Sequence, residues 1–206
     1  MVQTVRKLSA VGPVTTEPIT LAMARLHLRL DTEGSPPSHP DDTLVSALIT
    51  ASREAAEDYT GLAIAYQTYK LALDEFPSAA IVLNKWPVNA ITSITYKDAN
   101  NATQTVSSSD YFLDNYSKPS EVALQPNKTW PQTGTVANAV IVTFVAGFTD
   151  GLSPNPYPLP KSLKQAMLLT IGHLYDHREA ASSVQKYEIP LGVVSLMTPH
   201  RILMGM

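Results

Sequence analysis

The sequence contains no cysteine. A disulfide framework and a metal site built from thiolates are therefore both excluded. The chain must be stabilised by packing or by partner proteins, and this composition agrees with synthesis in a reducing cytoplasm. With 206 residues, of which 44% are hydrophobic, the chain is long enough to bury a core of its own.

Long hydrophobic runs are also missing. The longest apolar-rich stretch, residues 166–174, is far shorter than the roughly 20 residues that a membrane-spanning helix needs. The first residues include Arg6 and Lys7 but no apolar segment of the kind found in a cleavable signal. We therefore expect a soluble protein with no membrane partner and no cleavable export signal.

Positive charge is scarce. The formal net charge is −3, only 16% of residues are charged, and no segment of the chain is strongly basic. Proteins that bind nucleic acids by neutralising phosphates carry a basic stripe or patch. We therefore do not expect the chain to hold DNA tightly or to recognise its sequence.

Motifs of common enzymes are absent. The sequence has no P-loop, no G-x-G-x-x-G string and no serine in a G-x-S-x-G elbow. The paired carboxylates of Glu54, Glu57 and Asp58 stand beside Arg53 on a predicted helix, where a solvated polar face is the favoured interpretation. We expect no catalytic residue and no cofactor.

One weak alternative is a metal-dependent hydrolase. His173 and His177 are four residues apart, so they share one helix face, and with Asp176 they form an H-x-x-D-H string. A third ligand would have to come from elsewhere in the chain. The favoured interpretation is that His173 packs against its neighbours and that His177 lies near the negative end of the helix dipole.

Apolar residues at helical spacing predict three helices, near residues 20–30, 41–60 and 161–177. Thr20 is a plausible N-cap for the first, Asp41 or Asp42 for the second, and Gly61 is placed to end the second. Apolar residues of 161–177 cover more than one face, which is typical of a helix buried between neighbours. A short C-terminal helix, broken at Pro199, is predicted to follow.

Between these helices the period changes to two. Residues 66–148 show the alternation of strands, and one small sheet of about six short strands is predicted. The last strand, at 139–148, is apolar on both faces. The fold class is therefore α+β: a helical frame with an inserted, mostly antiparallel, β-rich segment. We assign 1–18 to an N-terminal arm, 19–65 and 149–206 to the helical core, and 66–148 to the inserted domain.

Two aromatic residues and the C-terminal end stand out. Trp86 and Trp130 each precede a proline, which favours extended backbone. Core packing is the default for both side chains, and a sugar-binding surface is the alternative. The apolar end of the chain, after Pro199, either docks onto another protein or folds back on its own core.

The order of these segments resembles the head-to-tail connector, or adaptor, proteins of long-tailed phages and gene transfer agents. The likeness runs from Glu17 to Arg201. It is carried by the ordered set EPITLAMARLHLRLD, DDTLVSALITASREAAEDYTGLAI, QTYKLALDEFP, KWPVNAITSITYKDANNATQTV, NAVIVTFVAGF, LKQAMLLTIGHLYDHREA and PLGVVSL. Met23, where such proteins often have an acidic residue, and the proline-rich loop at 151–160 depart from the common pattern.

The resemblance implies a structural virion protein of the neck, without catalysis or cofactor. Such subunits form a homo-oligomeric ring, typically of twelve copies, with the portal protein above and a tail-side connector, stopper or terminator protein below. The ring extends the channel through which DNA leaves the capsid. Another ring or tail-tube component of the same particle is the alternative. The candidate portal or subunit contacts are Ile189, Leu191, Val193, Leu196, Arg201, Ile202, Leu203 and Met204.

Overall fold

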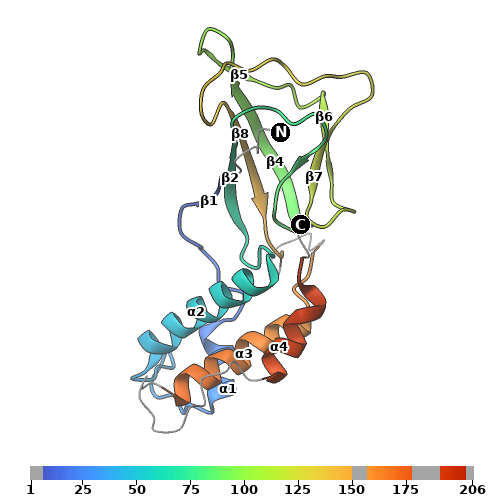
Figure 1. Cartoon of the computed structure of the whole chain (residues 1–206). Coiled ribbons are helices and arrows are strands. Elements are labelled where there is room, and N and C mark those ends of the chain that lie inside the picture. Colours follow the sequence, from blue (N-terminus) through green and yellow to red (C-terminus); the bar gives the residue numbers. More distant parts are fainter. Residues whose placement is uncertain (1–6, 150–156, 178–190, 203–206) are drawn as a thin grey trace. The chain divides into compact units, whose positions relative to one another are not determined.

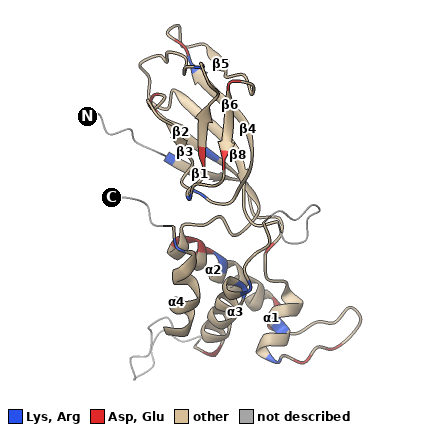
Figure 2. Ribbon diagram, turned by 90° about the vertical axis from the view of Figure 1, so that its right-hand side faces the viewer, with Lys and Arg blue, Asp and Glu red and all other residues tan. Residues whose placement is uncertain are grey.

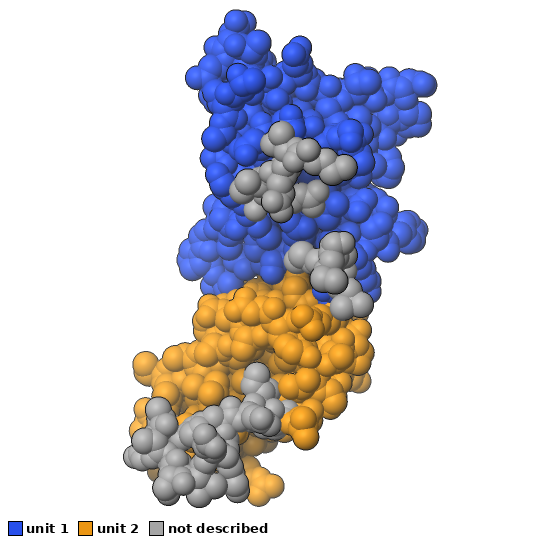
Figure 3. Space-filling model, in the orientation of Figure 1, with its two compact units in different colours: residues 1–15, 66–148, 202–206 blue, residues 16–65, 149–201 orange. Residues whose placement is uncertain are grey.

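The computed structural model describes residues 7–149, 157–177 and 191–202. Contacts within the chain separate two units, which Figure 3 shows in different colours. The β unit contains residues 66–148, with residues 7–15 and Ile202 of the chain ends. The helical unit contains residues 16–65, together with the described residues between 149 and 201.

The larger sheet of the β unit has the strand order β1-β2-β8-β4-β5, and every neighbouring pair is antiparallel (Figure 1). Strand β8, at its centre, alternates buried and half-buried residues, and Val142 and Phe144 are among the buried ones. Tyr69 of β2 stacks on Phe144 with ring centroids 5.7 Å apart, which extends the apolar core across the sheet. The bounds are β1 Lys7–Val11, β2 Gln67–Leu73, β4 Val88–Lys97, β5 Thr103–Thr105 and β8 Val140–Ala146.

A smaller antiparallel sheet has the order β3-β7-β6. Its strands are β3 Ile81–Val82, β6 Tyr111–Asp114 and β7 Glu121–Leu124. The insertion was predicted to form one sheet, and the two sheets correct that expectation. Strand β3 is only two residues long and therefore too short to give a period-two signal.

The predicted N-terminal arm also differs from the structure. Residues Lys7–Val11 form strand β1, which pairs with β2 as an edge strand. Four of its five residues are exposed, so the strand lacks the alternation of buried and exposed positions on which a prediction depends.

The helical unit contains α1 Leu21–Leu28, α2 Asp42–Thr60, α3 Lys161–Asp176 and α4 Leu191–Met197, with a 3₁₀ turn at Thr198–His200. Helix α3 packs against α1, α2 and α4. Its buried residues are Leu163, Ala166, Met167 and Ile171. No helix in the described ranges is long and apolar enough to cross a membrane.

The helix ends follow local chemistry in part. Thr20 caps α1 as predicted, because its hydroxyl accepts the Met23 N–H at 3.2 Å. Gly61 ends α2 in the left-handed conformation with φ of 75°. Asp41 occupies the N-cap position of α2, but its side chain makes no cap hydrogen bond and instead accepts the hydroxyl of Tyr175 on α3. A tertiary contact therefore replaces the expected cap.

Asp42 fastens the loop between α1 and α2. Its carboxylate accepts two hydrogen bonds from the Arg25 guanidinium, one of them from Nε at 2.7 Å, and a third from the His39 backbone N–H at 2.9 Å. The hydrogen bonding from Arg25, followed by that from His39, lowers the pKa of Asp42 below its ordinary value. The loop thus returns to the beginning of α2 as an ordered connection.

We predict that Gly134→Ala destabilises the β unit. A Cβ at this position would lie 2.6 Å from the carbonyl oxygen of Asp98, which is backbone and cannot move aside cheaply. The expected loss is about 1–3 kcal/mol in the free energy of unfolding. Both tryptophans, Trp86 and Trp130, belong to the β unit, so fluorescence-detected denaturation measures it directly.

Gly192→Ala on α4 is the matched control, since a Cβ there meets nothing within 4 Å. That variant should leave the tryptophan transition unchanged. An unchanged transition for the Gly134 variant would mean that the approach to Asp98 is not tight in solution.

Candidate functional surfaces of the two units

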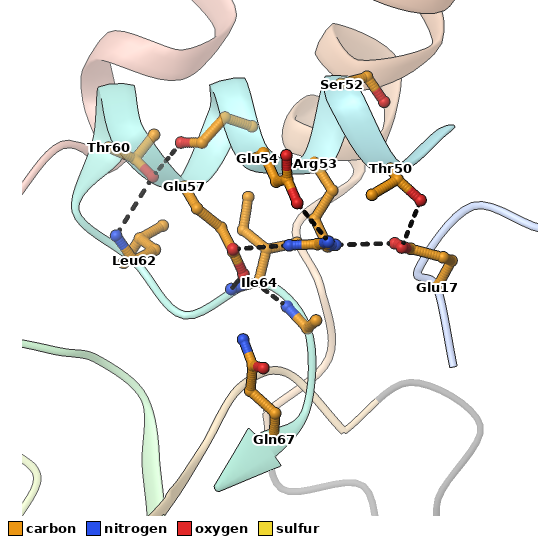
Figure 4. A network of polar contacts seen from close by, with 12 residues as sticks. Glu17, Thr50, Ser52, Arg53, Glu54, Glu57, Thr60, Leu62, Ile64 and Gln67 are labelled. Atoms are coloured by element: carbon orange, nitrogen blue, oxygen red, sulfur yellow. Dashed lines mark hydrogen bonds and ion pairs between the residues drawn. The ribbon is translucent and has the colours of Figure 1, made fainter. Parts of the chain in front are cut away.

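A buried ionic network in the helical unit centres on Arg53 of α2, whose side chain is 5% exposed (Figure 4). Its Nε donates to Oε2 of Glu17 at 2.9 Å, and its Nη1 donates to Oε2 of Glu57 at 2.8 Å. A longer contact of 3.4 Å joins Nη2 to Glu54. Thr50 donates to the other oxygen of Glu17 at 3.0 Å. The network thereby fixes the segment before α1 against α2.

The other oxygen of Glu57 holds the chain that follows α2. Its Oε1 accepts the backbone N–H groups of Ile64 and Ala65 at 2.8 and 2.9 Å. Residues 62–65 are all buried, so these N–H groups have no access to solvent and need an internal acceptor. One carboxylate therefore satisfies both the cation of Arg53 and the backbone leading to β2.

The pKa of Arg53 reflects this arrangement. Burial works to lower it, but the hydrogen bond to Glu17 and the negative charges of Glu57, Glu17 and Glu54 outweigh burial and raise the pKa above its ordinary value. The Arg53 guanidinium therefore keeps its positive charge in the interior of the folded helical unit.

This network corrects the expectation that Glu54, Glu57 and Asp58 all lie on a solvated face. Glu54 and Asp58 are exposed, but Glu57 and Arg53 are buried. Four residues apart on a helix, an arginine and a glutamate resemble an ordinary surface pair. In the folded chain the backbone of residues 64–65 binds Glu57, Glu17 binds Arg53, and the pair is buried.

The histidine pair has the geometry of a helix end. The rings of His173 and His177 are 4.6 Å apart, and Nδ1 of His177 lies 2.9 Å from the carbonyl oxygen of His173. Within the described part of the chain, no three potential metal ligands gather at one place. The hydrolase alternative therefore gains no support from this geometry.

The tryptophans take part in packing within the β unit. Trp130 stacks on Phe76 with centroids 4.8 Å apart, and its Nε1 donates to the carbonyl of Ala79 at 3.4 Å. Trp86 meets Phe148 edge to face at 5.9 Å, and the Lys118 ammonium lies 4.0 Å from its ring centroid. Both indoles are half-buried, and their described contacts are with this chain's own residues.

The C-terminal segment separates into buried and exposed positions. Val193 and Met197 of α4 are buried, whereas Leu191 is 84% exposed and Leu196 is half-buried. Of the other predicted contacts, Ile202 is buried and Arg201 is exposed. Ile189, Leu203 and Met204 lie outside the described residues.

Polar contacts secure this segment on α2 and α3. The hydroxyls of Tyr59 and Thr198 are 2.9 Å apart, and Oγ of Ser162 is 2.7 Å from Nε2 of His200. The Arg201 guanidinium lies 5.6 Å from the centroid of the Tyr59 ring. Leu191 is thus a large apolar side chain held at the surface by a well-anchored helix.

No protein-family model matches the sequence, and no curated protein matches it. Solved structures match the fold. A chain of the "Virion of native gene transfer agent (GTA) particle" aligns with a TM-score of 0.76 and 24% identity. A chain of the "Neck of native GTA particle computed with C12 symmetry" gives 0.74 and 24%, and one of the "Neck of empty GTA particle computed with C6 symmetry" gives 0.73 and 23%. Each alignment covers 97% of both chains, so the fold is shared over nearly the whole length.

We predict that Glu57→Ala destabilises the helical unit by about 3–5 kcal/mol, because it leaves Arg53 and two backbone N–H groups buried with fewer acceptors. Circular dichroism at the helical band during denaturation measures the change. Asp58→Ala, at the exposed neighbouring position, should stay within about 0.5 kcal/mol of the parent. Equal effects of the two variants would contradict the buried network.

Proposed function

We propose that this chain is a structural subunit of a virion neck, and that its copies form a ring joining the capsid portal to the tail. Support comes from the fold that it shares, over 97% of both chains, with chains of gene transfer agent particles, two of them from structures titled as necks. A shared fold supports the proposal by analogy. The exposed apolar side chains of the helical unit support it independently, because a partner could bury them.

The proposed ring has twelve copies, in keeping with the C12 and C6 symmetries with which those two neck structures were computed. A ring of this kind is closed by head-to-tail contacts between unlike surfaces. The portal protein is the proposed partner on one side, and a tail-side connector, stopper or terminator protein is the partner on the other.

The ring is proposed to extend the channel for DNA without gripping it. Lysines and arginines are scattered over both units, and the net charge of the chain is −3 (Figure 2). A strongly basic channel wall would slow the passage of DNA, because each phosphate contact adds to the affinity. The proposed function therefore includes no catalysis, no cofactor and no sequence-specific contact with DNA.

Leu191 is the proposed portal contact with the clearest structural basis. A partner can bury the exposed leucine of a helix that Val193 and Met197 already hold in place, which removes apolar surface from water. Leu196 and Arg201 lie on the same C-terminal segment and are proposed to border this contact. Val193 and Met197 are instead buried, and they hold α4 in place within the chain.

We expect Leu191→Glu to yield tailless heads, since it places a charge in the proposed apolar contact at a position too exposed to affect folding. Electron microscopy of particles from producing cells would count joined and unjoined heads. Leu191→Met is the matched control, because it keeps the position apolar, and it should leave joining intact. Normal particles from the Leu191→Glu variant would remove Leu191 from the proposed portal contact.

A further inference from the structure

Helix α1 leaves its largest exposed apolar side chain outside the contacts that hold the helix in place. Ala24 is buried, Arg25 binds Asp42 of α2, and His27 lies against Gly172 of α3, where an added Cβ would be 3.4 Å from the imidazole. Leu26, between them in sequence, is 82% exposed, and Met23 is exposed beside it. A short helix that is apolar on nearly all sides is normally covered on all sides.

The exposed face of α1 combines apolar groups with one cation. Ala22, Met23 and Leu26 are followed by Arg29, which is also exposed. Residues three apart share a helix face, so Leu26 lies beside Met23. Arg29 follows as the C-cap residue of α1, in the left-handed conformation with φ of 56°. The face therefore requires a partner that offers small or apolar groups beside a carboxylate.

Helix α2 presents such groups on its own exposed side. Ala51 and Ala55 are exposed and four residues apart, and the carboxylates of Glu54 and Asp58 are exposed next to them. Small side chains leave room for a protruding leucine, and the carboxylates complement Arg29 in charge.

We propose that α1 of one copy docks onto the exposed side of α2 in a neighbouring copy, with Leu26 packed against Ala51 and Ala55 and with Arg29 paired to Asp58. This inference rests on the proposed function, because a ring supplies the neighbour. The two faces are unlike and complementary, which is what a head-to-tail interface requires. A two-fold dimer would instead bring two α1 faces together and leave both Arg29 side chains without the acidic partner offered by α2.

Cysteine crosslinking of the purified full-length chain tests the contact, because the chain has no native cysteine. The Leu26→Cys/Ala55→Cys variant, treated with a short bismaleimide at high protein concentration, should give a ladder of covalent oligomers. Each single variant should stay uncrosslinked, and an equal mixture of the two should stop at covalent dimers. Leu191→Cys/Ala55→Cys is the matched control, since Leu191 is as exposed as Leu26, and it should give no ladder.

Two crosslinking results would overturn the proposal. Covalent dimers from Leu26→Cys alone would show that like faces meet, and the absence of a ladder from the double variant would show that α1 and α2 of different copies do not meet. A missing ladder in a chain that is nevertheless found in the particle neck would refute this contact and leave the proposed function standing. A ladder from a chain that is absent from the neck would support this contact and refute the proposed function.

Charge reversal gives a second test by sedimentation. Arg29→Glu places a carboxylate opposite Asp58, and Asp58→Arg places a cation opposite Arg29, so each alone should weaken self-association about tenfold or more. When the two variants are mixed in equal amounts, they can alternate around the ring, so that every contact joins opposite charges. Self-association should therefore return. If mixing restores nothing, the Arg29–Asp58 pairing is wrong.

Discussion

The carboxylate of Glu57 holds together the helical unit on which the candidate surfaces depend. One oxygen neutralises Arg53, which also binds Glu17 ahead of α1, and the other accepts the backbone of residues 64–65 behind α2. A buried ion pair is costly to desolvate and stabilises a fold only when its remaining hydrogen bonds are satisfied, as they are here. The benefit is geometric: the segment before α1 and the segment after α2 are both fixed on one helix.

With this frame in place, the helical unit can carry large apolar side chains on its outside. Leu26 and Leu191 stand on two helices that are anchored by Asp42 and by the contacts of Thr198 and His200. Neither leucine contributes to the core of its own chain, so each is available for the contacts with other chains that we propose. The β unit has a core of its own around β8.

The sequence predicts this architecture well where its period is strong. The helices at 42–60 and 161–176 and the central strand β8 have regular apolar spacing, and all three were expected. The sequence does not predict features that tertiary contacts decide. Arg53 and Glu57 look like a surface pair, but Glu17 and the backbone of residues 64–65 bind them in the interior. The carboxylate of Asp41 binds Tyr175 instead of capping α2. The short β3 and the exposed β1 give no alternation of buried and exposed residues. The exposure of Leu26 depends on which face of α1 packs: Ala24 is buried, and Leu26 lies outside that face.

We propose that copies of this chain form a ring in the neck of a virion. Cryo-electron microscopy of intact particles, with the chain traced in the density, is the decisive measurement. We expect a closed ring between portal and tail in which α1 of every copy lies against α2 of the next. Density for the chain in the tail tube, in the capsid shell or nowhere in the particle would contradict it.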